Sequence, residues 1–174
     1  MAQLKGTTIS GFSAADLRSP AVAWSTGLGL GFLPKAPGTW GSIGALGVWW
    51  FGLSGLSAAV QLMVMVLYFC VSLWACQRVC DQYGLGDAGE IVADECLGLW
   101  LSLWALPQVW WLALLGFALF RVFDIKKPWV IGRLDRNLKG GLGILADDMA
   151  AGAITCALLW ALVLTFRALG INLA

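Results

Sequence analysis

Residues 144–166 read ILADDMAAGAITCALLWALVLTF, in which two aspartates are followed by eighteen residues without a charge. A helix needs about 20 predominantly apolar residues to cross the hydrocarbon core of a bilayer. The stretch therefore predicts a membrane helix that begins beside Asp147 and Asp148. Ionisable side chains at the edge of such a helix are costly in lipid and usually mark a functional site.

The whole chain has the composition of an integral membrane protein. Its 174 residues are 60% hydrophobic and only 12% charged, and the mean hydropathy is +0.81, whereas globular domains are about 25% charged. The net charge of +1 lacks the basic excess of a nucleic-acid-binding protein, so that class is excluded. The absence of histidine excludes phosphatases and phospholipases built on catalytic histidines. The five cysteines lie in or beside apolar runs, and we expect inert thiols.

Four further apolar stretches predict membrane segments, so the expected fold is an all-α, polytopic helical bundle. Together with 144–166 they give about five segments. An N-terminal piece, 21–33, is too short to span and is expected to be interfacial or re-entrant. We divide the chain into an N-terminal cytoplasmic segment, 1–26, and one membrane-embedded domain, 27–170. The four stretches are 41–56, 58–75, 91–106 and 109–123.

The connections between these segments set the expected orientation. Two of them, 77–90 and 124–143, are long and charged, and the second carries five basic residues. Cytoplasmic loops carry an excess of Lys and Arg, so both connections and the N-terminus are expected in the cytoplasm. Carboxylates from three predicted helices then meet at the cytoplasmic face. They are Asp94, Glu95, Asp124, Asp147 and Asp148.

Five carboxylates at one depth need a compensating cation. Oxygen ligands without His or Cys favour a hard ion, Mg²⁺ or Ca²⁺. The alternative is that each acid is solvated at the interface or paired with a nearby arginine. Because the acids recur in three segments at one depth, we expect a metal site rather than five separate solvated groups.

Three charged segments supply candidate phosphate ligands. In 31–42, GFLPKAPGTWGS, Lys35 can add a positive charge and the hydroxyls of Thr39 and Ser42 can donate hydrogen bonds, although the segment also fits a plain interfacial turn with a helix cap. In 135–148, glycines precede the acid pair and Arg136 and Lys139 lie in a flexible basic loop, which also fits a linker.

The segment 121–129, RVFDIKKPW, leaves two interpretations open. Arg121 and Asp124 share a helix face at i, i+3 and can pair with each other, or Arg121 can hold a phosphate and Asp124 a metal. Lys126 and Lys127 lie at headgroup level, where basic residues are also explained by topology or by attraction to anionic lipids. Asp135 can pair with Arg133 or Arg136.

These motifs together resemble the phosphatidylglycerophosphatase A family, over about 27–152. The resemblance implies a Mg²⁺-dependent lipid phosphatase of the bacterial inner membrane, which converts phosphatidylglycerophosphate to phosphatidylglycerol with its site on the cytoplasmic face. Lys126 departs from the family pattern, in which an apolar residue is frequent. The matching segments are 31–42, IVADE at 91–95, FRVFDIKKPW at 120–129, LDRN at 134–137 and KGGLGILADDMAAG at 139–152.

We therefore expect the five carboxylates to hold one or two Mg²⁺ ions, with Lys35 beside them among the catalytic groups. The phosphate would contact Lys35, Thr39, Ser42, Arg121, Lys127, Arg136 and Lys139. Attack by a metal-activated water and an aspartyl-phosphate intermediate are both open, as is the oligomeric state. The alternative functions are a membrane phosphotransferase, whose Asp-Gly-x2-Ala-Arg motif is missing, and a transporter of anionic headgroups, whose charges should lie near the midplane.

Overall fold

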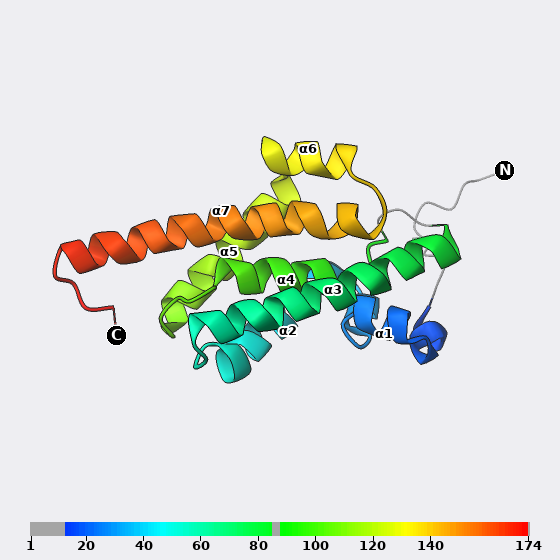
Figure 1. The fold of residues 1–174 in the computed structure, drawn as a ribbon, viewed down its shortest axis with the longest axis horizontal. Helices are drawn as coiled ribbons and strands as arrows, with labels where there is room; N and C mark the ends of the chain where they lie inside the picture. The colour runs from blue at the N-terminus through cyan, green and yellow to red at the C-terminus, as the bar shows by residue number, and fades with distance from the viewer. Residues whose placement is uncertain (1–12, 85–87, 174) are drawn as a thin grey trace.

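The computed structural model describes residues 13–84 and 88–173, and within these ranges there is no β-strand. The chain forms an elongated bundle in which the two longest helices, α3 (Ala58–Tyr83) and α7 (Gly140–Ala168), lie side by side (Figure 1). The remaining helices are α1 (Pro20–Ser25), α2 (Pro37–Val48), α4 (Ala93–Ser102), α5 (Trp110–Lys126) and α6 (Val130–Asn137). The expected all-helical class is confirmed. Of the expected N-terminal segment 1–26, residues 1–12 lie outside the described ranges.

The direction of the helices alternates. Gly98 of α4 lies against Asp148 of α7, Gly41 of α2 lies against Val92 before α4, and Gly140 at the start of α7 lies against Gln77 near the end of α3. The N-termini of α2, α4 and α7 therefore share one end of the bundle with the C-termini of α3 and α5. This is the arrangement expected of a chain that crosses a membrane back and forth.

Helix α4 is the most enclosed helix of the bundle. It packs between α7 and α2, and the side chains of Leu99 in α4 and Leu103 at its C-cap are fully buried. Phe120 of α5 and Leu159 of α7 belong to the same core. Side chains in such a core are packed about as densely as in an organic crystal. The packing therefore fixes α4, and with it the acids at its start.

Among the described residues, two helices, α3 and α7, are long and apolar enough to cross a membrane. Only 28% of the most apolar part of α3 and 33% of that of α7 is buried, whereas the core helix of a soluble protein would be mostly buried. Exposed side chains such as Met63, Leu67 and Trp74 on α3 are instead available to lipid. Helix α4 has ten residues, or about 15 Å, so the expectation of five membrane segments remains a prediction.

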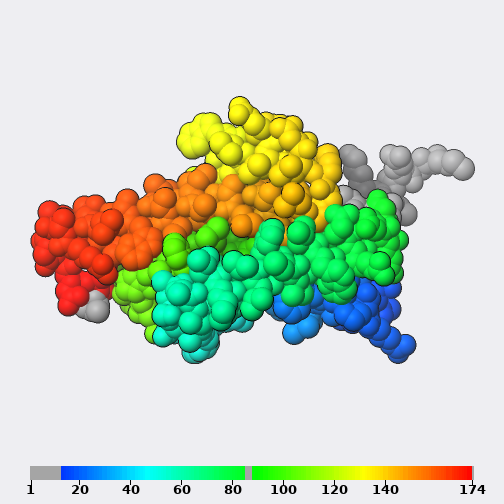
Figure 2. All heavy atoms as spheres, in the orientation of Figure 1, coloured from blue at the N-terminus to red at the C-terminus, as the bar shows by residue number. Residues whose placement is uncertain are grey.

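Two connections differ from their expected form. The expected connection 77–90 begins only after Tyr83, because α3 continues two turns past the predicted apolar stretch 58–75 and ends at Gly84, which has a φ of 65°. The connection 124–143 contains α6, which lies over the N-terminal half of α7 (Figure 2). The N-terminal piece 21–33 forms the six-residue α1 and a single turn, η2 (Leu30–Phe32), and α2 continues into a π-helical turn, η3 (Trp49–Leu53).

Candidate functional site

Three helices place their acidic residues at the shared end of the bundle. Asp94 and Glu95 lie in the first turn of α4, and Asp124 lies near the end of α5. Asp147 and Asp148 lie in α7 about two turns after it begins at Gly140. The structure therefore brings together all five of the acids selected from the sequence.

Glycines at the crossing of α4 and α7 allow Asp148 to approach the acids of α4. A Cβ atom added at Gly152 would lie 2.4 Å from the carbonyl oxygen of Gly98, and one added at Gly98 would lie 2.8 Å from that of Asp148. Both distances are shorter than a normal contact, so any side chain here would push the helices apart. The close crossing is thus a condition for the acid cluster.

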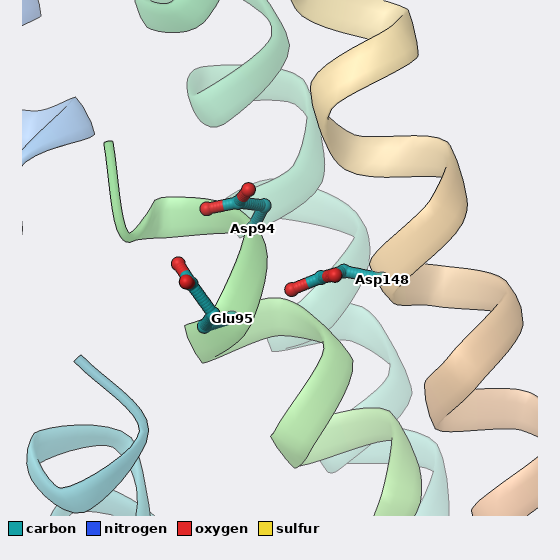
Figure 3. A group of neighbouring side chains, drawn as sticks. All are labelled: Asp94, Glu95 and Asp148. Atoms are coloured by element: carbon teal, nitrogen blue, oxygen red, sulfur yellow. The ribbon is translucent and has the colours of Figure 1, made fainter. Parts of the chain in front are cut away.

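Asp94, Glu95 and Asp148 form the centre of the site, and we refer to them as the acid triad. Each contributes a carboxylate oxygen, and these atoms lie within 4.8 Å of one another. The side chains converge on one space between α4 and α7 (Figure 3). One oxygen of each acid is buried without a hydrogen-bond partner among the described residues: Oδ1 of Asp94, Oε2 of Glu95 and Oδ2 of Asp148. Such oxygens are costly to bury unless they bind something.

Arg121 connects the acid triad to α2 and α5. Its Nη1 atom lies 2.6 Å from Oδ2 of Asp124 and 3.6 Å from Oε1 of Glu95, and it donates a long hydrogen bond of 3.5 Å to the hydroxyl of Ser42. A Cβ at Gly38 would lie 1.8 Å from Oε1 of Glu95, so any larger residue there would displace the Glu95 carboxylate. The expected Arg121–Asp124 pair is therefore present, and Nε of Arg121 remains buried without a partner among the described residues.

Lys127 gives the two adjacent aspartates of α7, Asp147 and Asp148, different surroundings. It follows α5 with a φ of 42°, and its Nζ lies 2.6 Å from carboxylate oxygens of both Asp135 and Asp147. Burial lowers the pKa of Lys127, but the hydrogen bonds and charges of Asp135 and Asp147 outweigh this and raise its pKa above the ordinary value. Lys127 is therefore a cation held in place by Asp147, whereas Asp148 belongs to the acid triad.

A pocket of about 230 Å³ lies beside the acid triad. All five predicted acids line it, together with the predicted phosphate ligands Lys127 and Lys139. The remaining predicted ligands do not line it. Lys35 is exposed before α2, Thr39 is half-buried in the first turn of α2, and Arg136 is exposed at the end of α6. Arg121 is paired with Asp124 and does not itself line the pocket, and Ser42 is buried against Arg121.

Asp135 also lines the pocket, and sequence reasoning did not select it. We expected it to pair with Arg133 or Arg136, but its partner is Lys127, eight residues earlier. The charge pattern alone could not identify this pair, because it depends on the backbone turn at Lys127 that separates α5 from α6. The acids, the two lysines and the glycines at 140 and 143 together form a pocket suited to a phosphate and a hard cation.

Comparisons with known proteins agree with this chemistry. Residues 23–163 match the family model described as phosphatidylglycerophosphatase A. Phosphatidylglycerophosphatase A of Escherichia coli (strain K12) is 36% identical over 149 residues, which cover 85% of this chain and 86% of that protein. The protein of the same name from Haemophilus influenzae (strain ATCC 51907 / DSM 11121 / KW20 / Rd) is 38% identical over 137 residues, 78% of this chain and 84% of that protein. No solved structure matches the chain significantly.

Proposed function

The chain belongs to the phosphatidylglycerophosphatase A family, and from that premise we propose that it is a Mg²⁺-dependent phosphoric monoester hydrolase. It hydrolyses phosphatidylglycerophosphate to phosphatidylglycerol and inorganic phosphate. The observation that carries the metal assignment is the acid triad, in which carboxylate oxygens of three residues lie within 4.8 Å of one another and each residue has a buried oxygen without a partner among the described residues.

The chemistry of these donors supports Mg²⁺ as the resident ion. All three ligands are carboxylate oxygens, and magnesium is bound in proteins by one or a few carboxylates together with waters and substrate phosphate oxygens. Asp94, Glu95 and Asp148 would hold the ion. Bound there, it would polarise the phosphoryl oxygens and lower the pKa of a water molecule that attacks phosphorus.

The surrounding residues position the phosphate and balance its charge. Lys127 and Lys139 line the pocket and attract the phosphate monoester. Asp147 holds Lys127 at 2.6 Å, and Asp124 holds Arg121 at 2.6 Å, so both cations are fixed before the substrate binds. Phosphoryl transfer depends mainly on positioning and on stabilising charge, and these groups supply both.

One of the five carboxylates of the site acts as the general base. The attacking water gives one proton to this carboxylate while its oxygen forms the new bond to phosphorus. The bond that breaks joins phosphorus to the glycerol oxygen, which takes up the proton held by the carboxylate and leaves as the hydroxyl of phosphatidylglycerol. Inorganic phosphate is then released.

The site is proposed to face the cytoplasm from the bacterial inner membrane, in a chain that crosses it several times. Two observations support this placement. The end of the bundle that carries the pocket also carries the basic residues Arg133, Arg136 and Lys139, and such residues are concentrated in cytoplasmic loops. The opposite end, around Trp104 and Trp110, carries aromatic side chains typical of a membrane interface.

The test measures phosphate release from phosphatidylglycerophosphate by the full chain in mixed micelles, with Mg²⁺ or with EDTA. Asp148→Asn is expected to lower kcat/KM by roughly a hundredfold or more, because even the residues that support metal ligands contribute 10–100-fold. Asp81→Asn changes an exposed acid of α3 outside the pocket and serves as the control.

Direct binding provides an independent readout. Mn²⁺ can replace Mg²⁺ as a spectroscopic probe, and its binding, followed by electron paramagnetic resonance, should weaken in Asp148→Asn and remain unchanged in Asp81→Asn. Full activity in EDTA, or Mn²⁺ binding that is indifferent to Asp148, would refute the metal assignment.

A further inference from the structure

An apolar groove of about 310 Å³ lies between α2 and α5, outside the acid pocket. On α2 it is lined by Ile43, Leu46 and Gly47, and on α5 by Trp110, Ala113 and Leu114. Several of these side chains are half-exposed, including Ile43 at 47% and Leu114 at 51%. The groove therefore opens on the apolar outer surface of the bundle.

The groove lies between two polar contacts that link α2 and its extension η3 to α5 and the residues just before it. At one end Arg121 of α5 contacts Ser42 of α2. At the other, the side-chain amide of Gln108 donates a 2.8 Å hydrogen bond to the carbonyl oxygen of Trp50. Small residues lie between these contacts: a Cβ added at Gly47 would have no atom within 4 Å.

The groove is aligned with the acid site. Residues 110, 114, 117, 121 and 124 follow one another on α5 at spacings of three or four, so they form one stripe along the helix. Trp110 and Leu114 line the groove at the start of this stripe, and Arg121 and Asp124 lie at its other end. On α2, Leu46 lies one turn after Ser42. The groove and Arg121 thus lie on the same face of α5, and Arg121 contacts Glu95 of the acid triad.

We propose that this groove holds an acyl chain of the phospholipid substrate and thereby positions its headgroup at the acid site. The inference rests on the proposed function and identifies the part of the protein that recognises the lipid tail. An acyl chain matches the apolar lining, and the anionic headgroup to which it is attached would lie toward the acid pocket, where Lys127 and Lys139 supply positive charge. A soluble phosphate ester has no apolar chain that could occupy the groove.

The groove aligns the substrate and adds little hydrophobic affinity. A lipid tail in the bilayer is already in surroundings as apolar as leucine, so its transfer into the groove gains little free energy. What the groove provides is a fixed depth and direction for the headgroup. Because a misplacement of about 1 Å can cost roughly a hundredfold in rate, alignment alone is a large effect.

Gly47→Leu tests the inference because Gly47 lines the groove and a Cβ added there has open space around it. We expect kcat/KM for dipalmitoyl phosphatidylglycerophosphate to fall about tenfold or more, while that for a dihexanoyl substrate, whose chains are too short to fill the groove, falls less than threefold. Gly52→Leu is the matched control, since Gly52 is exposed, has open space around it and does not line the groove. Equal losses on both substrates, or equal losses in both variants, would overturn the proposal.

A measurement independent of turnover uses a phosphatidylglycerophosphate with a diazirine at the end of one acyl chain. After photolysis, mass spectrometry is expected to find label on the groove residues of α2 and α5. Excess unlabelled substrate, or the substitution Gly47→Leu, should lower the amount of label on these residues at least fivefold. Label on the exposed face of α3 should not change. Groove labelling that neither competitor nor substitution reduces would refute the inference. Absence of phosphate release by the unaltered protein would instead refute the proposed function, whatever the labelling result.

Discussion

Gly152→Ala is the substitution with which the geometry of the site can be tested most directly. The added methyl group would lie 2.4 Å from the carbonyl oxygen of Gly98 and 3.1 Å from its carbon. Both atoms belong to the backbone of α4, so neither can rotate away. Ordinary contact begins near 3.4 Å, and α7 must therefore move away from α4 by about 1 Å.

The expected consequence is a loss of activity that exceeds the loss of stability. Overpacking of this kind costs about 1–3 kcal/mol, which for a chain of this size lowers the midpoint of thermal unfolding by a few degrees. Metal ligands, however, must keep their distances within about 0.2 Å. A movement of 1 Å carries Asp148 away from Asp94 and Glu95, and we expect kcat/KM to fall roughly a hundredfold.

Gly116→Ala provides the matched control for this experiment. The added Cβ would lie 2.5 Å from Cδ2 of Leu103 and 3.0 Å from Cδ1 of Leu159, which are ends of flexible side chains in the core away from the acids. Its unfolding midpoint should fall by a similar few degrees, but its activity should stay within about threefold of the unaltered protein. If Gly152→Ala keeps full activity, or if both variants lose activity equally, the crossing of α4 and α7 does not position the metal ligands.

Three further predictions concern individual contacts of the site. Lys127→Met should lower kcat/KM at least tenfold. Asp135→Asn should have a smaller effect, because Asp135 is exposed and Lys127 keeps its contact with Asp147. Equal losses of kcat/KM in the two variants, measured in steady-state assays, would contradict this prediction. Gly38→Ala should weaken Mn²⁺ binding about tenfold or more, because its Cβ would lie 1.8 Å from Oε1 of Glu95 and would displace that carboxylate. Unchanged Mn²⁺ affinity in a titration would count against Glu95 as a metal ligand. If water attacks directly, acid-quenched reactions with ³²P-labelled substrate should leave no label on the protein, and labelled aspartate would require a covalent intermediate instead.

The sequence was sufficient to predict the acid cluster because membrane topology limits where charges can lie. Once the apolar stretches alternate in direction, Asp94, Asp124 and Asp148 must meet at one end of the bundle, and the structure agrees. The different environments of Asp147 and Asp148 could not be predicted in this way. They depend on the positive φ at Lys127, which turns that lysine back toward Asp147. In the sequence Asp147 and Asp148 are adjacent and identical, so nothing indicates which of them contacts the lysine.

The boundaries of α3 and the existence of α6 were missed for a different reason. We placed the end of the apolar stretch near the first charges, but a helix continues beyond the apolar region when its charged turns can reach water. Gln77, in one of these turns, accepts a hydrogen bond from the backbone N–H of Gly141, so the extension of α3 also holds the start of α7. Gly84 was the visible signal for the true end, since glycine commonly terminates helices in a left-handed conformation.

The alternating direction of the helices has an electrostatic consequence. The aligned peptide dipoles of a helix leave about half a positive charge at its N-terminus and half a negative charge at its C-terminus. Asp94 and Glu95 lie in the first turn of α4, where the positive end of the helix attracts their carboxylates. Asp124 lies near the negative end of α5, and there Arg121 at 2.6 Å opposes the unfavourable field. The polarity of each helix therefore determines which carboxylates need a side-chain cation and which are partly balanced by the backbone itself.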